Sequence, residues 1–367
     1  MDSDSFRKLN GIPETKLGDI SSMSRADETL KPLWTDAPDA AERLDEKRVS
    51  GEITRSEYND LAHFIDHGWL IWREAIDPEL IDRFVQDIRS IHRHPGFFVT
   101  TNHRNGKSRL QSSGATPDRF ESLFDLYVNL ESSRRVCLHP RVVRFLSLVF
   151  DTRPVAFQQL LFQRSNQHQV HQDTSVVAVE DPLLLAASWV ALEDVQEGSG
   201  ELAFYDRSHR LPHYLFKDGT KRCNFAVDDY VACARTLEEM CRERGLAYER
   251  FLAKKGDVFF WTADLVNRSH PRSLPEDTSR LSCVTHYCPA ATTPFWFNHH
   301  PEKRQIEPYG KAAAFASLHY ILPAKSKMLR PSSPFMAATD ILGEAPALLS
   351  CLGDFVRPLG TGSRHGA

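Results

Sequence analysis

The residues of this sequence that could do chemistry begin with His171 and Asp173, which are separated by Gln172. In a β-strand, residues two apart project from the same face, so the imidazole and the carboxylate would lie side by side and Gln172 would point away. Such a pair supplies two corners of the two-histidine, one-carboxylate site that binds Fe(II) in non-haem oxygenases. A second histidine from elsewhere in the chain would have to complete that site.

The triplet alone is weak evidence for a metal site. The chain contains 16 histidines, so about one pair with this spacing is expected by chance in a chain of this composition. On its own, the triplet is explained more simply as a surface histidine beside a surface aspartate. Its significance therefore depends on the segments that surround it.

The segments around the triplet indicate a β-rich fold. Short apolar or alternating runs, broken by Gly, Pro, Asp and Ser, occur at 155–162, 176–179, 183–192, 202–205, 258–261 and 281–287. Such short strands, separated by turn signals, are typical of an antiparallel sandwich or barrel. Before them, 68–72 resembles a buried strand, a helix should begin at Asp77-Pro78, and another should cover 142–150. The expected fold is mainly β with flanking helices.

The composition places the chemistry in one domain. Residues 1–55 are polar and poor in aromatic residues, so we expect a mobile arm or loosely docked helices there. Residues 56–367 are expected to form a single domain. A helical insert is expected near 228–252, because apolar residues recur there every three or four positions.

The bulk numbers exclude several classes of protein. The 367 residues are 41% hydrophobic and carry a net charge of only -4. This balance indicates a globular chain and gives no reason to expect nucleic acid or a membrane as partner. No apolar run reaches about 18 residues. The seven cysteines are scattered and form no C-x-x-C pair, which favours reduced thiols in a cytoplasmic protein that acts on a small molecule.

The order of motifs after the triplet resembles one known family. The chain reads SWVALEDVQEGSGEL at 188–202, SHR at 208–210, GDVFFW at 256–261 and VTHYCP at 284–289. This order resembles the phytanoyl-CoA dioxygenase family of Fe(II)/2-oxoglutarate-dependent oxygenases, over roughly 61–289. The resemblance implies a double-stranded β-helix, the jelly-roll or cupin-like barrel. It also implies Fe(II) as cofactor, 2-oxoglutarate as co-substrate, and oxidation of a C–H bond in a small metabolite.

The resemblance also implies residue roles. His171 and Asp173 match the first two iron ligands, and Arg280 matches the arginine that binds the distal carboxylate of 2-oxoglutarate. A guanidinium suits this role, because its planar fork donates two charge-assisted hydrogen bonds to a carboxylate. Ser282 lies two residues further along the expected strand and can face the same carboxylate. An internal salt bridge from Arg280 to an aspartate or glutamate is the alternative.

Two further residues are expected to face the co-substrate. Trp189 matches a tryptophan that lines the co-substrate pocket in the family, although plain core packing would explain it equally well. Gln159, on the strand before the triplet, is also expected to face the pocket.

The distal histidine is where the sequence departs from the family. Relatives of this branch carry HADLVHGGSP where this chain has TADLVNRSHP at 262–271. In one interpretation the loop is shifted and His270, ten residues before Arg280, is the third ligand. In the other, Asn267 occupies the ligand position, and since an amide oxygen is a poor Fe(II) ligand beside an imidazole, iron binding is weak or absent. The spacing narrowly favours His270.

Three functional classes therefore remain open. The leading one is an Fe(II)/2-oxoglutarate oxygenase whose substrate pocket includes the segment 97–114. Basic residues there, His103, Arg104, Lys107 and Arg109, suggest an anionic or hydroxyl-rich substrate. The second is a degenerate relative that binds a ligand or catalyses a non-redox step without iron. The third is a sugar-binding or structural barrel without catalysis, which leaves the co-occurrence of His171, Asp173 and Arg280 unexplained.

Overall fold

The structure is a computed structural model of the chain. The structure describes residues 30–91, 99–102, 108–110, 121–165, 168–224, 228–275, 277–298 and 304–315. Among these residues, no helix is long and apolar enough to cross a membrane.

The N-terminal helices are part of the core from Leu33 onward. The short helix η3 (Trp34–Asp36) buries Trp34, whose indole N–H donates to the carbonyl of Leu148 at 2.8 Å. Helix α2 (Ala40–Val49) then packs against α3 (Arg55–His67), which begins with a reciprocal cap between Thr54 and Glu57. Of the residues expected to form a mobile arm or loosely docked helices, 34–36 and 40–49 are helical and contribute Trp34 and Leu44 to the core, while 1–29 lie outside the described residues.

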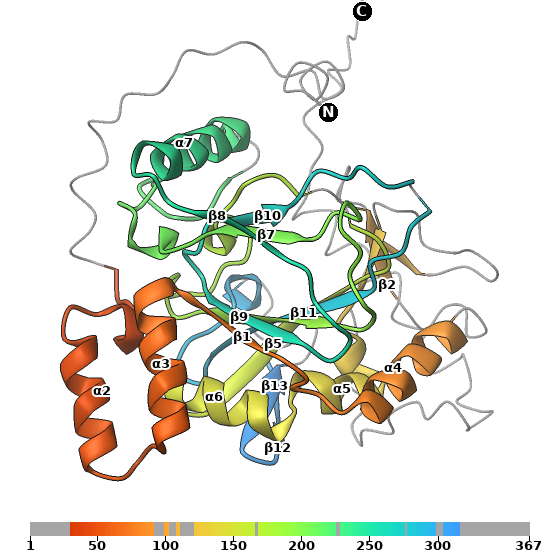
Figure 1. Cartoon of the computed structure of the whole chain (residues 1–367), viewed down its shortest axis with the longest axis horizontal. Helices are drawn as coiled ribbons and strands as arrows, with labels where there is room; N and C mark the ends of the chain where they lie inside the picture. Colours follow the sequence, from red (N-terminus) through yellow and green to blue (C-terminus); the bar gives the residue numbers. More distant parts are fainter. Residues whose placement is uncertain are drawn as a thin grey trace, which may run out of the picture.

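A large sheet forms the centre of the molecule (Figure 1). Its strands run in the order β1-β9-β6-β11-β5-β4-β2-β3, and β13 joins β5 in parallel. The bounds are β1 (Trp69–Trp72), β2 (Val99–Asn102), β3 (Ser108–Leu110), β4 (Glu121–Phe124), β5 (Pro154–Phe162), β6 (Ala186–Ala191), β9 (Val258–Thr262), β11 (Ser282–Pro289), β12 (Ile306–Tyr309) and β13 (Ala312–Phe315).

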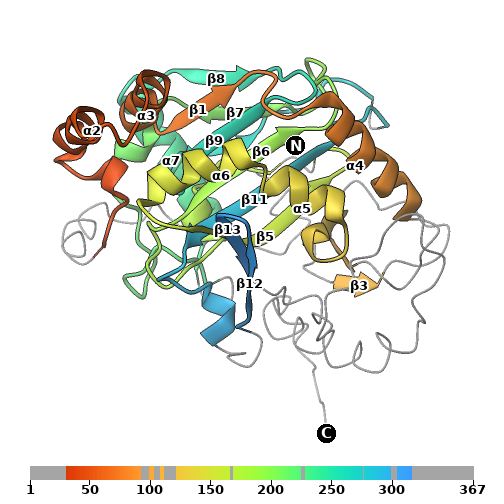
Figure 2. The same cartoon turned by 90° about the horizontal axis from the view of Figure 1, so that it is seen from below.

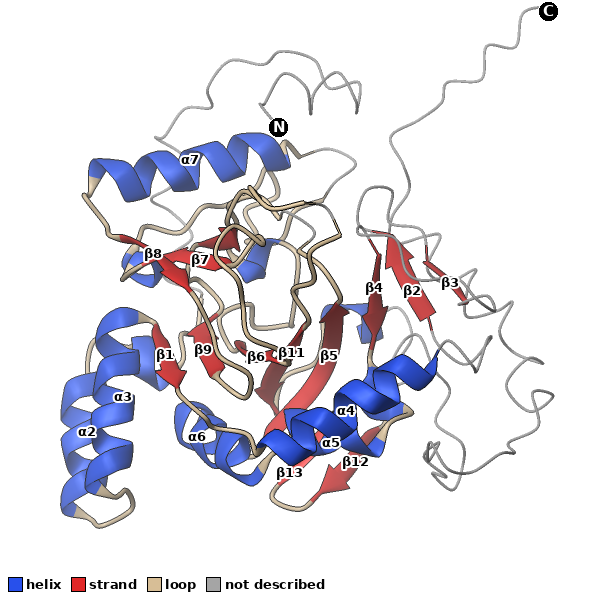
Figure 3. Ribbon diagram, turned by 45° about the vertical axis from the view of Figure 1, so that its right-hand side comes forward, coloured by secondary structure: helices blue, strands red, loops and turns tan. Residues whose placement is uncertain are grey.

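A small sheet lies over one face of the large one (Figure 3). It contains β7 (Leu202–Tyr205), β8 (Tyr248–Phe251) and β10 (Asn267–Ser269), and the isolated bridge from His171 to Asn267 extends it. From β5 to β11 the chain passes back and forth between the two sheets. The central strands of the large sheet, in the order β9-β6-β11-β5, face the strands of the small sheet in the order β8-β7-β10-171. This alternation is the double-stranded β-helix, so the expected fold is confirmed.

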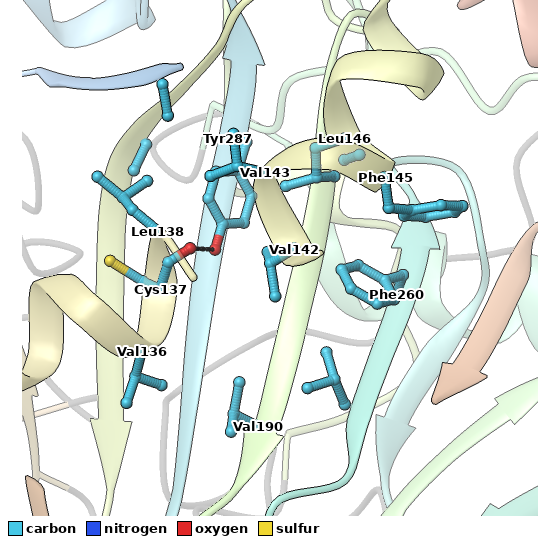
Figure 4. Close-up of a cluster of buried hydrophobic side chains, with 14 of the residues drawn as sticks. Val136, Cys137, Leu138, Val142, Val143, Phe145, Leu146, Val190, Phe260 and Tyr287 are labelled. Atoms are coloured by element: carbon cyan, nitrogen blue, oxygen red, sulfur yellow. Dashed lines mark hydrogen bonds between the residues drawn. The ribbon is translucent and has the colours of Figure 1, made fainter. Parts of the chain in front are cut away.

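Helices cover the other face of the large sheet (Figure 2). They are α4 (Pro78–Ile91), α5 (Glu131–Cys137) and α6 (Pro140–Phe150). In the core between them and the sheet, Tyr287 is fully buried and donates its hydroxyl to the carbonyl of Cys137 at 2.6 Å (Figure 4). Residues on β11 alternate between this core and the opposite face, so Cys283 and Tyr287 pack on the helices while His286 faces the small sheet.

The expected insert contains helix α7 (Tyr230–Glu243), followed by strand β8. The remaining short helices are η4 (Leu126–Val128), η5 (Asp173–Ser175), η6 (Ser208–Arg210) and η7 (Phe295–Asn298). The strand expected at 176–179 is wrong. Only Val179 forms an isolated bridge there, because η5 turns the chain immediately after the triplet.

Candidate functional site

A pocket lies between the two sheets, and three of the expected site residues, His171, Trp189 and Arg280, line it. Its walls come from β5, β6, β9, β10 and β11, and from the segment that carries the triplet. The lining residues are Leu160, Phe162, His168, His171, Val176, Val177, Trp189, Leu202, Trp261, Asn267, Arg268, Ser269, Arg280, Val284 and His286.

His171 is held with one ring nitrogen facing its neighbour in the triplet. Its Nδ1 lies 2.8 Å from the carbonyl of Gln169. A carbonyl only accepts hydrogen bonds, so Nδ1 carries a proton and Nε2 is the ring nitrogen that faces Asp173. That Nε2 lies 3.4 Å from Oδ1 of Asp173. A proton or a metal ion can lie between these two atoms.

Asp173 uses its two oxygens differently. Oδ2 accepts the indole N–H of Trp261 at 2.8 Å and lies 3.4 Å from Nε2 of His286. Oδ1 faces His171 and the amide of Asn267, whose Nδ2 lies 3.4 Å away. Burial alone would raise the pKa of Asp173, but contacts with His171 and His286 outweigh it and hold the pKa below its ordinary value. The carboxylate is therefore charged.

Gln172 points away from the pocket, as expected, and anchors the triplet. Its side-chain amide donates to the carbonyl of Asp264 at 2.7 Å, and its oxygen lies 3.5 Å from Nζ of Lys221. Lys221 pairs with Asp264 at 2.7 Å, and His213 lies 2.9 Å from the same carboxylate oxygen. Burial alone would raise the pKa of Asp264, but Lys221 and His213 lower it to about 2. This buried ion pair fixes the backbone behind the site.

The structure places Asn267, and not His270, beside His171 and Asp173. Asn267 is directly opposite His171, with backbone hydrogen bonds of 3.0 and 2.9 Å between them. The ring of His270 contacts the hydroxyl of Tyr248 at 2.9 Å, and His270 is not among the pocket-lining residues. The expected loop shift is therefore absent, because pairing of β10 with both His171 and β7 fixes the register.

Arg280 is a buried cation that lines the same pocket. It is only 3% exposed, and one guanidinium nitrogen donates to the carbonyl of Gly200 at 3.0 Å, while Nε has no partner. Within the described part of the chain, no aspartate or glutamate pairs with it, so the alternative of an internal salt bridge is not observed there. Burial, with help from Arg272, lowers the pKa of Arg280 to about 10. An anion would compensate this buried charge.

Ser282 and Trp189 flank Arg280. Ser282 shares the pocket face of β11 by alternation, and its buried hydroxyl has no partner within the described residues. The guanidinium carbon of Arg280 lies 5.9 Å from the centre of the Trp189 ring, and Trp189 lines the pocket. Both residues therefore lie where the expected co-substrate carboxylate would need a hydroxyl donor and an aromatic wall.

Gly200 allows the chain to approach Arg280 closely. Its φ of +87° is in the region that favours glycine. A Cβ at this position would lie 2.4 Å from the Cβ of Ser165. The turn at 198–200 therefore needs glycine both for its conformation and for space.

Gln159 does not face the pocket. Its side chain accepts from the hydroxyl of Ser133 at 2.6 Å and donates to Thr285 at 3.4 Å, on the helix-covered side of the sheet. The neighbouring Gln158 is instead paired with His286 in the strand register, and its buried side-chain oxygen has no partner among the described residues. The expectation for Gln159 was wrong by one residue. Adjacent residues of a strand point to opposite faces of the sheet, so Gln158 and Gln159 face different sides.

His286 and Trp261 are site residues that the sequence motifs contained but did not identify. A spacing of two extends from Arg280 through Ser282 and Val284 to His286, and this spacing could have indicated that all share one face. The structure does not place the side chains of the basic residues expected near the substrate. His103, Arg104 and Lys107 are outside the described residues, as is the side chain of Arg109.

The donor set suits a metal ion only in part. Within the described part of the chain, no group of three or more His, Cys, Asp or Glu side chains could hold a metal ion. Two conventional donors are nevertheless oriented for one, namely Nε2 of His171 and Oδ1 of Asp173. The third neighbour on the same side is the amide of Asn267, a donor of a different chemical type.

Several solved structures resemble this chain at low sequence identity. The epimerase SnoN from nogalamycin biosynthesis, in complex with Fe3+, alpha ketoglutarate and nogalamycin RO, has 16% identity and a TM-score of 0.49, over 77% of this chain and 96% of its own. EctD from S. alaskensis, in its apoform, has 14% identity and a TM-score of 0.48, over 65% and 78%. HygX from Streptomyces hygroscopicus, with nickel, 2-oxoglutarate and hygromycin B bound, has 15% identity and a TM-score of 0.43, over 65% and 88%.

The sequence itself identifies the family. No curated protein matches the chain. The family model described as phytanoyl-CoA dioxygenase (PhyH) matches residues 64–274, which is more than half of the 367 residues. The matched segment contains the triplet, Trp189 and the turn at Gly200, and Arg280 follows a few residues after it. This chain therefore belongs to the phytanoyl-CoA dioxygenase family.

Proposed function

We propose that this protein is an Fe(II)- and 2-oxoglutarate-dependent oxygenase that oxidises a C–H bond of a small-molecule metabolite. One observation carries the proposal: His171, whose Nε2 lies 3.4 Å from Oδ1 of Asp173, lines the same pocket as Arg280, a buried cation that has no carboxylate partner among the described residues. A site for a metal cation and a site for an anion in one pocket suit 2-oxoglutarate. One end of this molecule would chelate the metal, and its far carboxylate would pair with Arg280. Family membership supports the same class of enzyme.

Residues of this chain would bind the metal and the co-substrate in different parts of the pocket. His171 and Asp173 would hold the metal, and Arg280 with Ser282 would bind the far carboxylate of 2-oxoglutarate. Bound iron and 2-oxoglutarate would supply oxygen activation, with 2-oxoglutarate leaving as succinate and CO₂. Trp261 keeps one oxygen of Asp173 occupied and so directs the other toward the metal position.

The pocket walls determine which bond of a substrate can react. Leu160, Val177 and Val284 are apolar and exclude water from the space beside His171. Arg268 and His168 add polar groups to the same lining. We infer a substrate with an apolar reacting carbon and a polar or anionic group that these side chains orient.

Anaerobic titration tests this function. The protein should bind one equivalent of Fe(II), and 2-oxoglutarate should then develop the visible absorption of a chelated Fe(II) complex. Asp173→Ala should abolish this absorption, whereas Asp194→Ala, which changes an exposed surface ion pair, should leave it unchanged. Aerobic turnover should yield succinate. Iron-loaded protein that binds no 2-oxoglutarate and forms no succinate with a panel of metabolites would contradict the proposal.

A further inference from the structure

The third protein ligand of the proposed metal site is not assigned by the motifs, and the inference made here rests on the proposed function. Three side chains are candidates: His270, His286 and Asn267. His270 is excluded by position, because its ring contacts Tyr248 outside the pocket lining. The choice lies between His286 on β11 and Asn267 on β10.

The two oxygens of Asp173 separate these candidates. His286 approaches Oδ2, which already accepts the indole N–H of Trp261. Asn267 approaches Oδ1, the oxygen that also faces Nε2 of His171. The side of the carboxylate that is free for a metal is therefore the side of Asn267.

The contacts of the two histidines agree with this division. Nδ1 of His171 contacts the carbonyl of Gln169, so Nε2 is the ring nitrogen that faces Oδ1 of Asp173. Nε2 of His286 faces the other oxygen, Oδ2, on the side of the carboxylate that Trp261 occupies. His286 therefore orients the carboxylate and is a positioning residue.

Asn267 also has the geometry that a ligand needs. As the direct bridge partner of His171, it projects its side chain to the same side of the small sheet. Its amide nitrogen and Nε2 of His171 each lie 3.4 Å from Oδ1 of Asp173. Neighbouring ligands of one octahedral ion, with bonds of about 2.1 Å, are roughly 3 Å apart. The Asn267 amide and Nε2 of His171 thus each need to approach Oδ1 of Asp173 by only a few tenths of an ångström.

We propose that the side-chain oxygen of Asn267 is the third protein ligand, which makes the site one histidine, one carboxylate and one amide. A half-turn of the amide exchanges Nδ2 for the oxygen. This turn gives up the hydrogen bond from Nδ2 to the carbonyl of Leu265 at 3.1 Å, and the metal bond replaces it. The formal charge of the site is the same as with a second histidine, because amide and imidazole are both neutral.

The amide changes which metal the site prefers. Imidazole ligands favour Fe(II), Ni(II) and Zn(II), whereas carbonyl and carboxylate oxygens suit Mn(II). The protein should therefore bind Fe(II) and Ni(II) more weakly than a two-histidine site does, with a smaller loss for Mn(II). Metal preference can be measured without any turnover.

The test compares the affinities of Mn(II) and Ni(II), by the electron paramagnetic resonance of free Mn(II) and by calorimetry. Asn267→His should tighten Ni(II) binding by about tenfold or more and change Mn(II) binding much less. Asn267→Ala should weaken Mn(II) binding by about tenfold or more. Asn267→Asp, which is nearly isosteric and adds a charged oxygen, should tighten Mn(II) binding. His270→Ala is the matched control and should leave both affinities unchanged, and circular dichroism verifies the fold of each variant.

The outcomes separate this inference from the proposed function. If Asn267→Ala keeps the parent affinity while His286→Ala or His270→Ala loses it, the ligand assignment is overturned and the metal-dependent function stands. If the parent binds no metal and Asn267→His does, both are overturned, and the protein is a relative without a working iron site. Loss in Asn267→Ala together with the expected change of preference in Asn267→His supports both.

Discussion

Trp69 and Trp261 are directly opposite each other on the neighbouring antiparallel strands β1 and β9, and each donates its indole N–H to an aspartate at 2.8 Å. The acceptor of Trp261 is Asp173 in the pocket, and the acceptor of Trp69 is Asp206 outside it. The two tryptophans therefore form a natural matched pair, in which only one member touches the proposed metal site.

Trp261→Phe should weaken metal binding by about tenfold to a hundredfold, because Asp173 loses the donor that orients it. Removing a buried hydrogen bond to a charged group should also cost roughly 1.5–3 kcal/mol of unfolding free energy. Trp69→Phe should cost a comparable or smaller amount of stability without any change in metal affinity. Urea unfolding and metal titration of both variants check this, and equal metal affinities would contradict the role of Trp261.

Arg280→Gln should abolish binding of 2-oxoglutarate without destabilising the protein in its absence. The pKa of Arg280 is lowered because its charge is buried, so the charged form gains no stability from the surrounding protein. In the parent, 2-oxoglutarate should raise the melting temperature in the presence of metal, as any ligand of the folded state does. Lys254→Gln, which changes an exposed ion pair with Asp194, should keep that response. A response retained in Arg280→Gln would exclude Arg280 as the anion site.

Lys221→Met should be strongly destabilising, by roughly 3–5 kcal/mol, because it leaves the buried carboxylate of Asp264 without its cation. The control is Lys254→Met, whose partner Asp194 is at a similar distance of 2.9 Å but in an exposed pair. That change should cost no more than about 1 kcal/mol. Denaturant unfolding measures both, and similar losses would show that burial of the Lys221 pair has no energetic consequence.

Asp36 should make stability fall as the pH rises from about 4 to about 6. Burial raises its pKa from 3.8 to about 6, so in this window the folded state holds a proton that the unfolded chain has released. Above about pH 6 the contribution is constant and unfavourable. Asp36→Asn still accepts the hydroxyl of Thr262 and should gain up to about 2 kcal/mol at pH 7. Asp39→Asn, at an exposed position, should retain the parent's pH profile, and unfolding at pH 4.5 and 7.5 distinguishes the two.

Motif order was sufficient to predict the parts of the site that follow from strand alternation. His171, Trp189 and Arg280 line the pocket, Asp173 lies beside His171, and the double-stranded β-helix was expected from the same motifs. Their positions depend on local spacing and on the two faces of a strand, which a sequence displays directly.

Long-range pairing determined what the sequence did not reveal. An irregularity in the pairing of β5 with β11, beside His286, sets which glutamine faces the pocket, and it reversed the expectation for Gln159. The register that excludes His270 depends on bonds from β10 to His171 and to β7, which lies more than sixty residues earlier. The role of His286 depends on its contact with Asp173, which is distant in the chain. Such contacts have no local signature.

The strand pair that joins residues 171 and 267 is held by main-chain hydrogen bonds alone. Asn267 is buried, so a replacement at position 267 must be of similar size if the fold is to remain intact. Codons for asparagine and histidine differ by a single base, so one point mutation in the gene could interconvert the two proposed metal chemistries. The architecture in this way leaves the metal chemistry open to evolutionary change at one buried position.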